Sequence, residues 1–143
     1  MKAEFLHVGL TVKDLKRTID FYQTYFGFKL EMTGVFDEQF IRGHNVLYRL
    51  VDGEYSDFCF LKSANGIVLE VFQFHPQKEA QEVEWARPGY THICFWVEDI
   101  FAVYERLKAD GVKIFFEPDV RQSPEEHWMF LQDPDGNLIE LQD

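Results

Sequence analysis

The sequence predicts an α+β protein in which one order of elements, strand-helix-strand-strand-strand, occurs twice. Two short stretches carry the main signal, because each has a glycine turn that leads into an apolar strand containing one glutamate. The glutamate follows the glycine by four residues in both stretches, from Gly66 to Glu70 and from Gly136 to Glu140. A histidine also lies in the first predicted strand of each half. These matched positions indicate an internal duplication.

The first half begins with a predicted strand over residues 4–12, followed by a helix that Asp14 caps and Gly27 ends. Apolar residues recur at helical spacing within this helix: they are Leu15, Ile19, Tyr22 and Phe26. Polar residues 37–45 predict a loop. The remaining strands are predicted over residues 28–36, 46–51, 57–61 and 67–74, with a turn at Asp52-Gly53.

The second half repeats this order after a polar linker. A strand over residues 90–97 precedes a helix that begins at the N-cap Asp99 and ends at Gly111. Further strands are predicted over 112–117, 127–131 and the residues after Gly136, with a loop over 119–126. We therefore expect a single domain, residues 1–143, built from module 1 (4–75), a linker (76–89) and module 2 (90–143).

Composition limits the possible partners. The formal net charge of −11 disfavours nucleic acid and acidic membrane surfaces as partners. The two cysteines, Cys59 and Cys94, lie in apolar runs and are too few for a disulfide scaffold, so they are expected to be reduced core residues. With no membrane span or signal peptide evident, the expected location is cytoplasmic.

Four residues stand in repeated positions and could carry chemistry. His7 matches His92 at an offset of 85 residues, and Glu70 matches Glu140 at an offset of 70. A single histidine or glutamate on an apolar strand more often has an ordinary core partner. The repeated placement favours a shared divalent metal, because two imidazoles and two carboxylates suit zinc, nickel, cobalt, manganese or iron. A metal would also compensate the cost of burying the two carboxylates.

The chain resembles the vicinal oxygen chelate superfamily, which includes glyoxalase I, methylmalonyl-CoA epimerase, extradiol dioxygenases and the fosfomycin and bleomycin resistance proteins. The resemblance covers nearly the whole chain and is specific for the superfamily, though not for one activity. It rests on five motifs: His7-Val8-Gly9-Leu10-Thr11-Val12, Asp20-Phe21-Tyr22 before Phe26-Gly27-Phe28, Leu69-Glu70, Thr91-His92-Ile93, and Asp133-Pro134-Asp135-Gly136-Asn137 before Ile139-Glu140.

This resemblance implies two βαβββ modules that form an open, cup-shaped mixed β-sheet around a metal. The set His7, Glu70, His92 and Glu140 is similar to the metal ligands of glyoxalase I, which implies a lyase of the lactoylglutathione lyase type. Such an enzyme moves a proton of a thiol hemithioacetal through a metal-bound enediolate. Glu140 is implied as the main base, with Glu70 able to act on the opposite face. Nickel, zinc or cobalt is implied as the metal, with iron or manganese as alternatives, and a homodimer as the assembly.

Three other functions remain open within the resemblance. An extradiol-type dioxygenase uses two histidines and one glutamate, and Glu70 argues against it. An epimerase of the superfamily commonly has glutamine at the position of Glu70. A non-catalytic small-molecule binding protein of the resistance type lacks the metal ligands altogether, so the complete set disfavours it.

Overall fold

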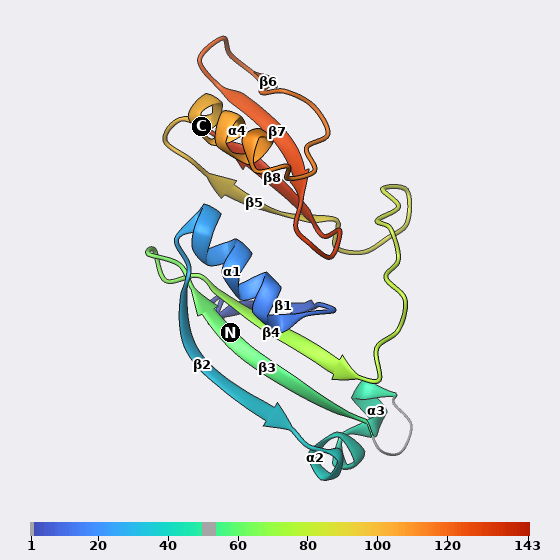
Figure 1. Cartoon of the computed structure of the whole chain (residues 1–143). Coiled ribbons are helices and arrows are strands. Elements are labelled where there is room, and N and C mark those ends of the chain that lie inside the picture. Colours follow the sequence, from blue (N-terminus) through green and yellow to red (C-terminus); the bar gives the residue numbers. More distant parts are fainter. Residues whose placement is uncertain (1, 50–53) are drawn as a thin grey trace. The chain divides into compact units, whose positions relative to one another are not determined.

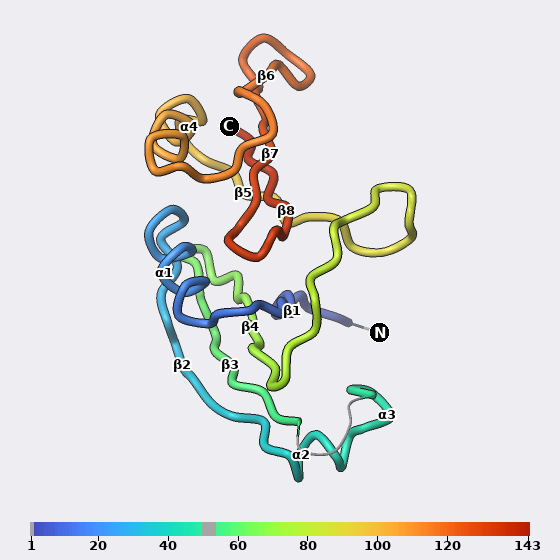
Figure 2. Tube along the Cα trace, turned by 45° about the vertical axis from the view of Figure 1, so that its right-hand side comes forward, coloured from blue at the N-terminus to red at the C-terminus, as the bar shows by residue number. Residues whose placement is uncertain are grey.

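The computed structural model describes residues 2–49 and 54–143, and it divides the chain into two compact units. Unit 1 is Met1–Glu79 and unit 2 is Ala80–Asp143, so the boundary falls inside the segment that was expected to be a linker. Residues 76–91 form neither helix nor strand and run as an irregular trace (Figure 2). Along the described residues, no helix is both long and apolar enough to cross a membrane.

Unit 1 is a four-stranded mixed sheet with one long helix (Figure 1). The strand order is β1-β4-β3-β2, in which β1 is parallel to β4 and the other neighbours are antiparallel. Its elements are β1 (His7–Thr11), α1 (Leu15–Phe26), β2 (Lys29–Phe36), α2 (Glu38–Gly43), α3 (Asn45–Tyr48), β3 (Tyr55–Lys62) and β4 (Val68–His75).

The ends of α1 follow from two residues in the sequence. The Asp14 side chain accepts a hydrogen bond from the Arg17 backbone N–H at 2.9 Å, and Gly27 ends the helix with a left-handed φ of 64°. Thr18, Phe21 and Tyr22 form the buried face of the helix, which packs on β3 and β4. The helix therefore covers one face of the sheet, and alternate strand residues point to the other face.

The predicted loop over residues 37–45 is wrong, because this segment is largely helical. Asp37 caps α2 by accepting the Phe40 N–H at 2.8 Å. The predicted strand over residues 46–51 is also wrong where it is described, since α3 includes Val46–Tyr48. Apolar content alone suggested a strand there, but the Tyr48 ring packs instead on Phe40 and Phe74. Leu50, Val51 and the predicted turn at Asp52-Gly53 lie outside the described residues.

Unit 2 has the same sheet plan. The strand order is β5-β8-β7-β6, with β5 parallel to β8 and the other neighbours antiparallel. The Asp99 side chain caps α4 by accepting the Ala102 N–H at 2.9 Å, and Gly111 follows the helix with φ 73°. The elements are β5 (His92–Trp96), α4 (Ile100–Ala109), β6 (Asp119–Val120), β7 (His127–Gln132) and β8 (Leu138–Gln142).

The second strand of unit 2 departs from the prediction. Residues 112–117 make only an isolated bridge between Ile114 and Leu131, whereas β6 lies within the segment 119–126 that was predicted to be a loop. Pro118 separates the two pairings, and proline cannot donate the backbone N–H that a continuous strand needs. The predicted core cysteine Cys94 is also exposed, because β5 is an edge strand of its sheet; Cys59 is buried as predicted.

The turn before β8 is held by a buried carboxylate. Asp133, only 4% exposed, accepts the backbone N–H groups of Asp135 and Asn137 through Oδ1 and the Asn137 side-chain amide through Oδ2, each at 2.9 Å. Burial raises the pKa of Asp133, and these three donors oppose the rise. The turn thereby fixes the point at which β8, and with it Glu140, begins.

Candidate metal centre

In unit 1, the structure brings two of the predicted ligands together. His7 of β1 and Glu70 of β4 lie on adjacent parallel strands, and His7 Nε2 is 3.1 Å from Glu70 Oε2. The Glu70 side chain is 16% exposed and the His7 ring 45% exposed. The pair is thus accessible on the histidine side, while the carboxylate is largely enclosed.

In unit 2, the equivalent residues form an equivalent pair. His92 Nε2 of β5 is 3.0 Å from Glu140 Oε2 of β8, and the two side chains are 26% and 12% exposed. Thr91 Oγ1 hydrogen-bonds to His92 Nδ1 at 2.9 Å, which leaves Nε2 directed at the carboxylate. Gln142 Nε2 donates to the other carboxylate oxygen, Glu140 Oε1, at 2.9 Å.

The strand register explains why both pairs form. His7 lies opposite Val68 and His92 opposite Leu138, and in each unit the glutamate is two residues farther along the same strand. Residues two apart on a strand share a face, so each histidine meets its glutamate diagonally across two parallel strands. The two pairs are therefore the same structural motif used twice.

A phenylalanine completes the motif in both units, and the sequence pattern alone did not indicate it. Phe60 lies opposite Glu70 and stacks on His7 with a centroid distance of 6.4 Å, while Phe130 lies opposite Glu140 and meets the His92 ring edge-to-face at 5.1 Å. The offset of 70 residues between them, the same as between the glutamates, was the available signal.

Further rings extend the apolar surroundings of the unit 1 pair. Phe58 lies beside Phe60, and Phe36 stacks on Phe58 and on Phe40 of α2, each with a centroid distance of 4.5 Å. Burial raises the pKa of Tyr48, and the charge of Glu70 adds to this rise, so α3 lies within electrostatic reach of the carboxylate. Helices α2 and α3 therefore contribute to the surroundings of the His7–Glu70 pair.

The donor spacing within each pair fits two neighbouring ligands of one metal ion. Donors about 2.1 Å from an ion are separated by about 3.0 Å at adjacent octahedral positions and about 3.4 Å at tetrahedral ones. The observed separations are 3.1 and 3.0 Å. Among the described residues, however, no three or more His, Cys, Asp or Glu side chains form a group that could hold an ion. The joining of both pairs into a four-ligand centre stays a prediction.

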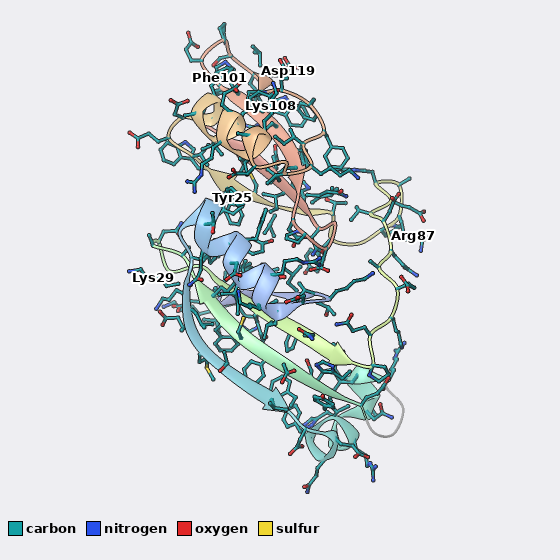
Figure 3. All side chains as sticks on the ribbon, in the orientation of Figure 1. Tyr25, Lys29, Arg87, Phe101, Lys108 and Asp119 are labelled. Atoms are coloured by element: carbon teal, nitrogen blue, oxygen red, sulfur yellow. The ribbon has the colours of Figure 1, made fainter. Side chains whose placement is uncertain are left out.

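Two other histidines have carboxylate partners away from these pairs. His127, at the start of β7, contacts Asp143 with 3.2 Å between Nδ1 and Oδ1, and Phe101 of α4, labelled in Figure 3, packs on its ring. His75, which ends β4, is 2.9 Å from Asp57 and stacks on Tyr55. The first pair joins the start of β7 to the C-terminal residue Asp143, and the second joins the neighbouring strands β4 and β3.

Comparison with known sequences identifies the family. Residues 4–141 match the Glyoxalase/Bleomycin resistance protein/Dioxygenase superfamily, and the chain belongs to this superfamily, as its residue motifs predicted.

Among individual relatives, lactoylglutathione lyases recur. That of Pseudomonas putida is 30% identical, with 96% of this chain and 83% of the relative covered. The lactoylglutathione lyase of Haemophilus influenzae is 31% identical, with coverages of 96% and 90%. Glyoxalase I of Saccharomyces cerevisiae is also 31% identical, but the chain spans only 43% of its length.

Solved structures confirm the predicted α+β class and the vicinal oxygen chelate fold. A glyoxalase family protein of Bacillus cereus superposes with a TM-score of 0.82 at 21% identity, covering 99% of this chain and 94% of that one. A glutamate-to-glutamine mutant of the fosfomycin resistance protein FosX of Listeria monocytogenes, in a complex with Mn(II) and 1S,2S-dihydroxypropylphosphonic acid, superposes with a TM-score of 0.68 at 24% identity, with coverages of 99% and 92%.

Proposed function

We propose that this protein is a metal-dependent lyase of the glyoxalase I type, which moves a proton between two adjacent carbons of an oxygen-rich small molecule. His7, Glu70, His92 and Glu140 would be the ligands of one divalent ion, with nickel, zinc or cobalt preferred over iron or manganese. The observation that carries the proposal is the repeated His–Glu pair, with donor separations of 3.1 and 3.0 Å. The similarity to lactoylglutathione lyases at about 30% identity supports it.

The chemistry would divide between the ion and the two glutamates. When bound, the ion supplies Lewis-acid polarisation of the substrate's adjacent oxygens. A glutamate carboxylate then takes the carbon-bound proton and returns it to the neighbouring carbon. We assign this step mainly to Glu140, with Glu70 serving the opposite face. Glu140 is 12% exposed and lies 3.0 Å from His92, which places its carboxylate beside the proposed histidine ligand.

The side chains around the pairs favour a substrate with an apolar portion. Phe60 and Phe130 border the two histidines, and Trp85 lies beside His92 with a centroid distance of 5.5 Å. A hemithioacetal formed between a 2-oxoaldehyde and a thiol combines adjacent oxygens with such a portion. The homodimer and the cytoplasmic location stay predictions.

Metal analysis of protein purified without added metal tests the proposal. Stoichiometric nickel, zinc or cobalt would support a lyase, iron would favour an extradiol-type dioxygenase, and no metal would favour a small-molecule binding protein. Nickel, cobalt and zinc should also raise the melting temperature of metal-stripped protein, since binding to the folded state alone stabilises it by about 2.7 kcal/mol at a hundredfold excess over Kd. Unchanged melting with all three metals would refute a preformed centre.

A further inference from the structure

The two His–Glu pairs share a backbone arrangement but differ in one side chain that follows the glutamate. Gln142 lies two residues after Glu140, and Phe72 lies two residues after Glu70. The backbone at both positions is held alike, because the Gln142 carbonyl accepts the Val97 N–H and the Phe72 carbonyl accepts the Val12 N–H, each at 2.8 Å. The difference between the units at this position therefore lies in the side chain.

This difference changes the environment of each carboxylate. In unit 2, Glu140 has both oxygens engaged, Oε2 with His92 at 3.0 Å and Oε1 with the Gln142 amide at 2.9 Å. In unit 1, the Phe72 ring packs toward Phe36 and Phe74, with centroid distances of 6.0 Å, and offers no donor. Among the described residues, the hydrogen-bonding or ion-pair partner of Glu70 is His7.

A second matched position adds to the asymmetry. Cys94 lies opposite Glu140 in the strand register, where unit 1 has Gly9 opposite Glu70. Unit 1 has no side chain at this point, and the Phe72 ring lies next to Gly9, 3.7 Å from where a Cβ would be.

We propose that Gln142 is a positioning residue that holds Glu140 Oε1 and thereby directs Oε2 toward His92 and the metal. Glu140 would be a preoriented carboxylate with a single oxygen for the ion, whereas Glu70 is paired with His7 and has Phe72, which offers no donor, at the position matching Gln142. A partner that hydrogen-bonds a metal ligand fixes its orientation, and its loss typically weakens metal affinity or activity by about ten- to a hundredfold. The assignment rests on the proposed function, because it concerns the same metal centre.

Matched substitutions at the two equivalent positions test the role of Gln142. Gln142→Leu and Gln142→Met remove the donor, and Phe72→Leu makes a comparable apolar change beside Glu70. Calorimetric titration with nickel alone should show affinity about ten- to a hundredfold weaker in both Gln142 variants, the usual effect of losing such a partner. Affinity in Phe72→Leu should stay close to wild type. The Met variant, which nearly keeps the length of glutamine, provides the test if the Leu variant does not fold.

Two further measurements separate positioning from a merely structural role. The melting temperature of metal-free protein should change little in Gln142→Met. At saturating nickel, with the hemithioacetal of methylglyoxal and glutathione, kcat should fall while KM stays near wild type. Equal nickel affinities in wild type and both Gln142 variants would overturn the positioning role alone. A wild-type chain that binds none of nickel, zinc or cobalt would overturn the proposed function and the positioning role together.

Discussion

Replacing Glu140 by glutamine should separate the chemistry of this carboxylate from its structural role. Glutamine nearly preserves the size of the side chain, and its amide oxygen can still accept from Gln142, whose Nε2 is 2.9 Å from Oε1. Its amide nitrogen can donate to His92 Nε2, which is 3.0 Å from Oε2. Both contacts change from charge-assisted to neutral, so unfolding should become easier by about 1–2 kcal/mol in total.

The effect on turnover should be much larger than this structural cost. A positioned general base contributes about a hundred- to ten-thousandfold to rate. At about 1.4 kcal/mol for each factor of ten, the loss in Glu140→Gln corresponds to roughly 3–5 kcal/mol in the barrier of the proton-transfer step. An amide cannot accept the carbon-bound proton, so the reduction should be seen in the chemical step.

The assay is exchange of the substrate's carbon-bound proton with solvent deuterium, followed by NMR. It should be run at saturating nickel, because the substitution also removes one anionic ligand and weakens metal binding. Glu125→Gln is the matched control, since Glu125 is exposed and lies outside the candidate centre. Exchange at the wild-type rate in metal-loaded Glu140→Gln would refute the assignment and make Glu70, or a group outside the four, the base.

Three further predictions follow from individual contacts. Glu70→Gln should fold normally but bind nickel more weakly in calorimetry, because one charged ligand becomes neutral; unchanged affinity would exclude Glu70 as a ligand. Gly34→Ala should lower the free energy of unfolding in urea by about 1–3 kcal/mol, because the added Cβ would lie 2.6 Å from the Phe58 ring. Gly43→Ala is the control and should have no such effect, because no atom lies within 4 Å of its added Cβ. The raised pKa of Asp133 means that the folded state binds the carboxyl proton more tightly than the unfolded state does. The unfolding free energy of wild type, measured relative to Asp133→Asn, should therefore fall as pH rises from about the ordinary value of 3.8 through the raised pKa. A difference between the two proteins that does not depend on pH would contradict this.

The sequence predicted best those elements whose ends are set by local chemistry. Asp14 and Asp99 cap the two long helices, and Gly27 ends the first one, as their residue types indicate. The predicted strand was wrong at Val46–Tyr48. The apolar run there is compatible with a strand, but packing against Phe40 and Phe74 favours a short helix. Tertiary contacts of this kind cannot be inferred from a short apolar run alone.

The candidate site was predictable to the same extent. Although the binding of one metal ion stays a prediction, the repeat pointed to four residues that the structure brings together in two pairs. It did not identify Phe60 and Phe130, because an aromatic residue on a strand looks the same whether it packs in the core or borders a histidine. Nor did it identify Gln142, whose importance depends on a contact made by one amide with Glu140 Oε1.

The apolar neighbours of the two glutamates explain why each half places its glutamate beside its histidine. Leu69 and Val71 flank Glu70, and both are 1% exposed or less; Ile139 and Leu141, which flank Glu140, are fully buried. A slip of one residue in strand pairing would turn these four side chains out of the core and point each glutamate into it. The cost of exposing such residues, about 1.5–3 kcal/mol for each, therefore fixes the register that places each glutamate beside its histidine. The side chains of Phe72 and Gln142 do not set this register, and at this matched position the two halves differ.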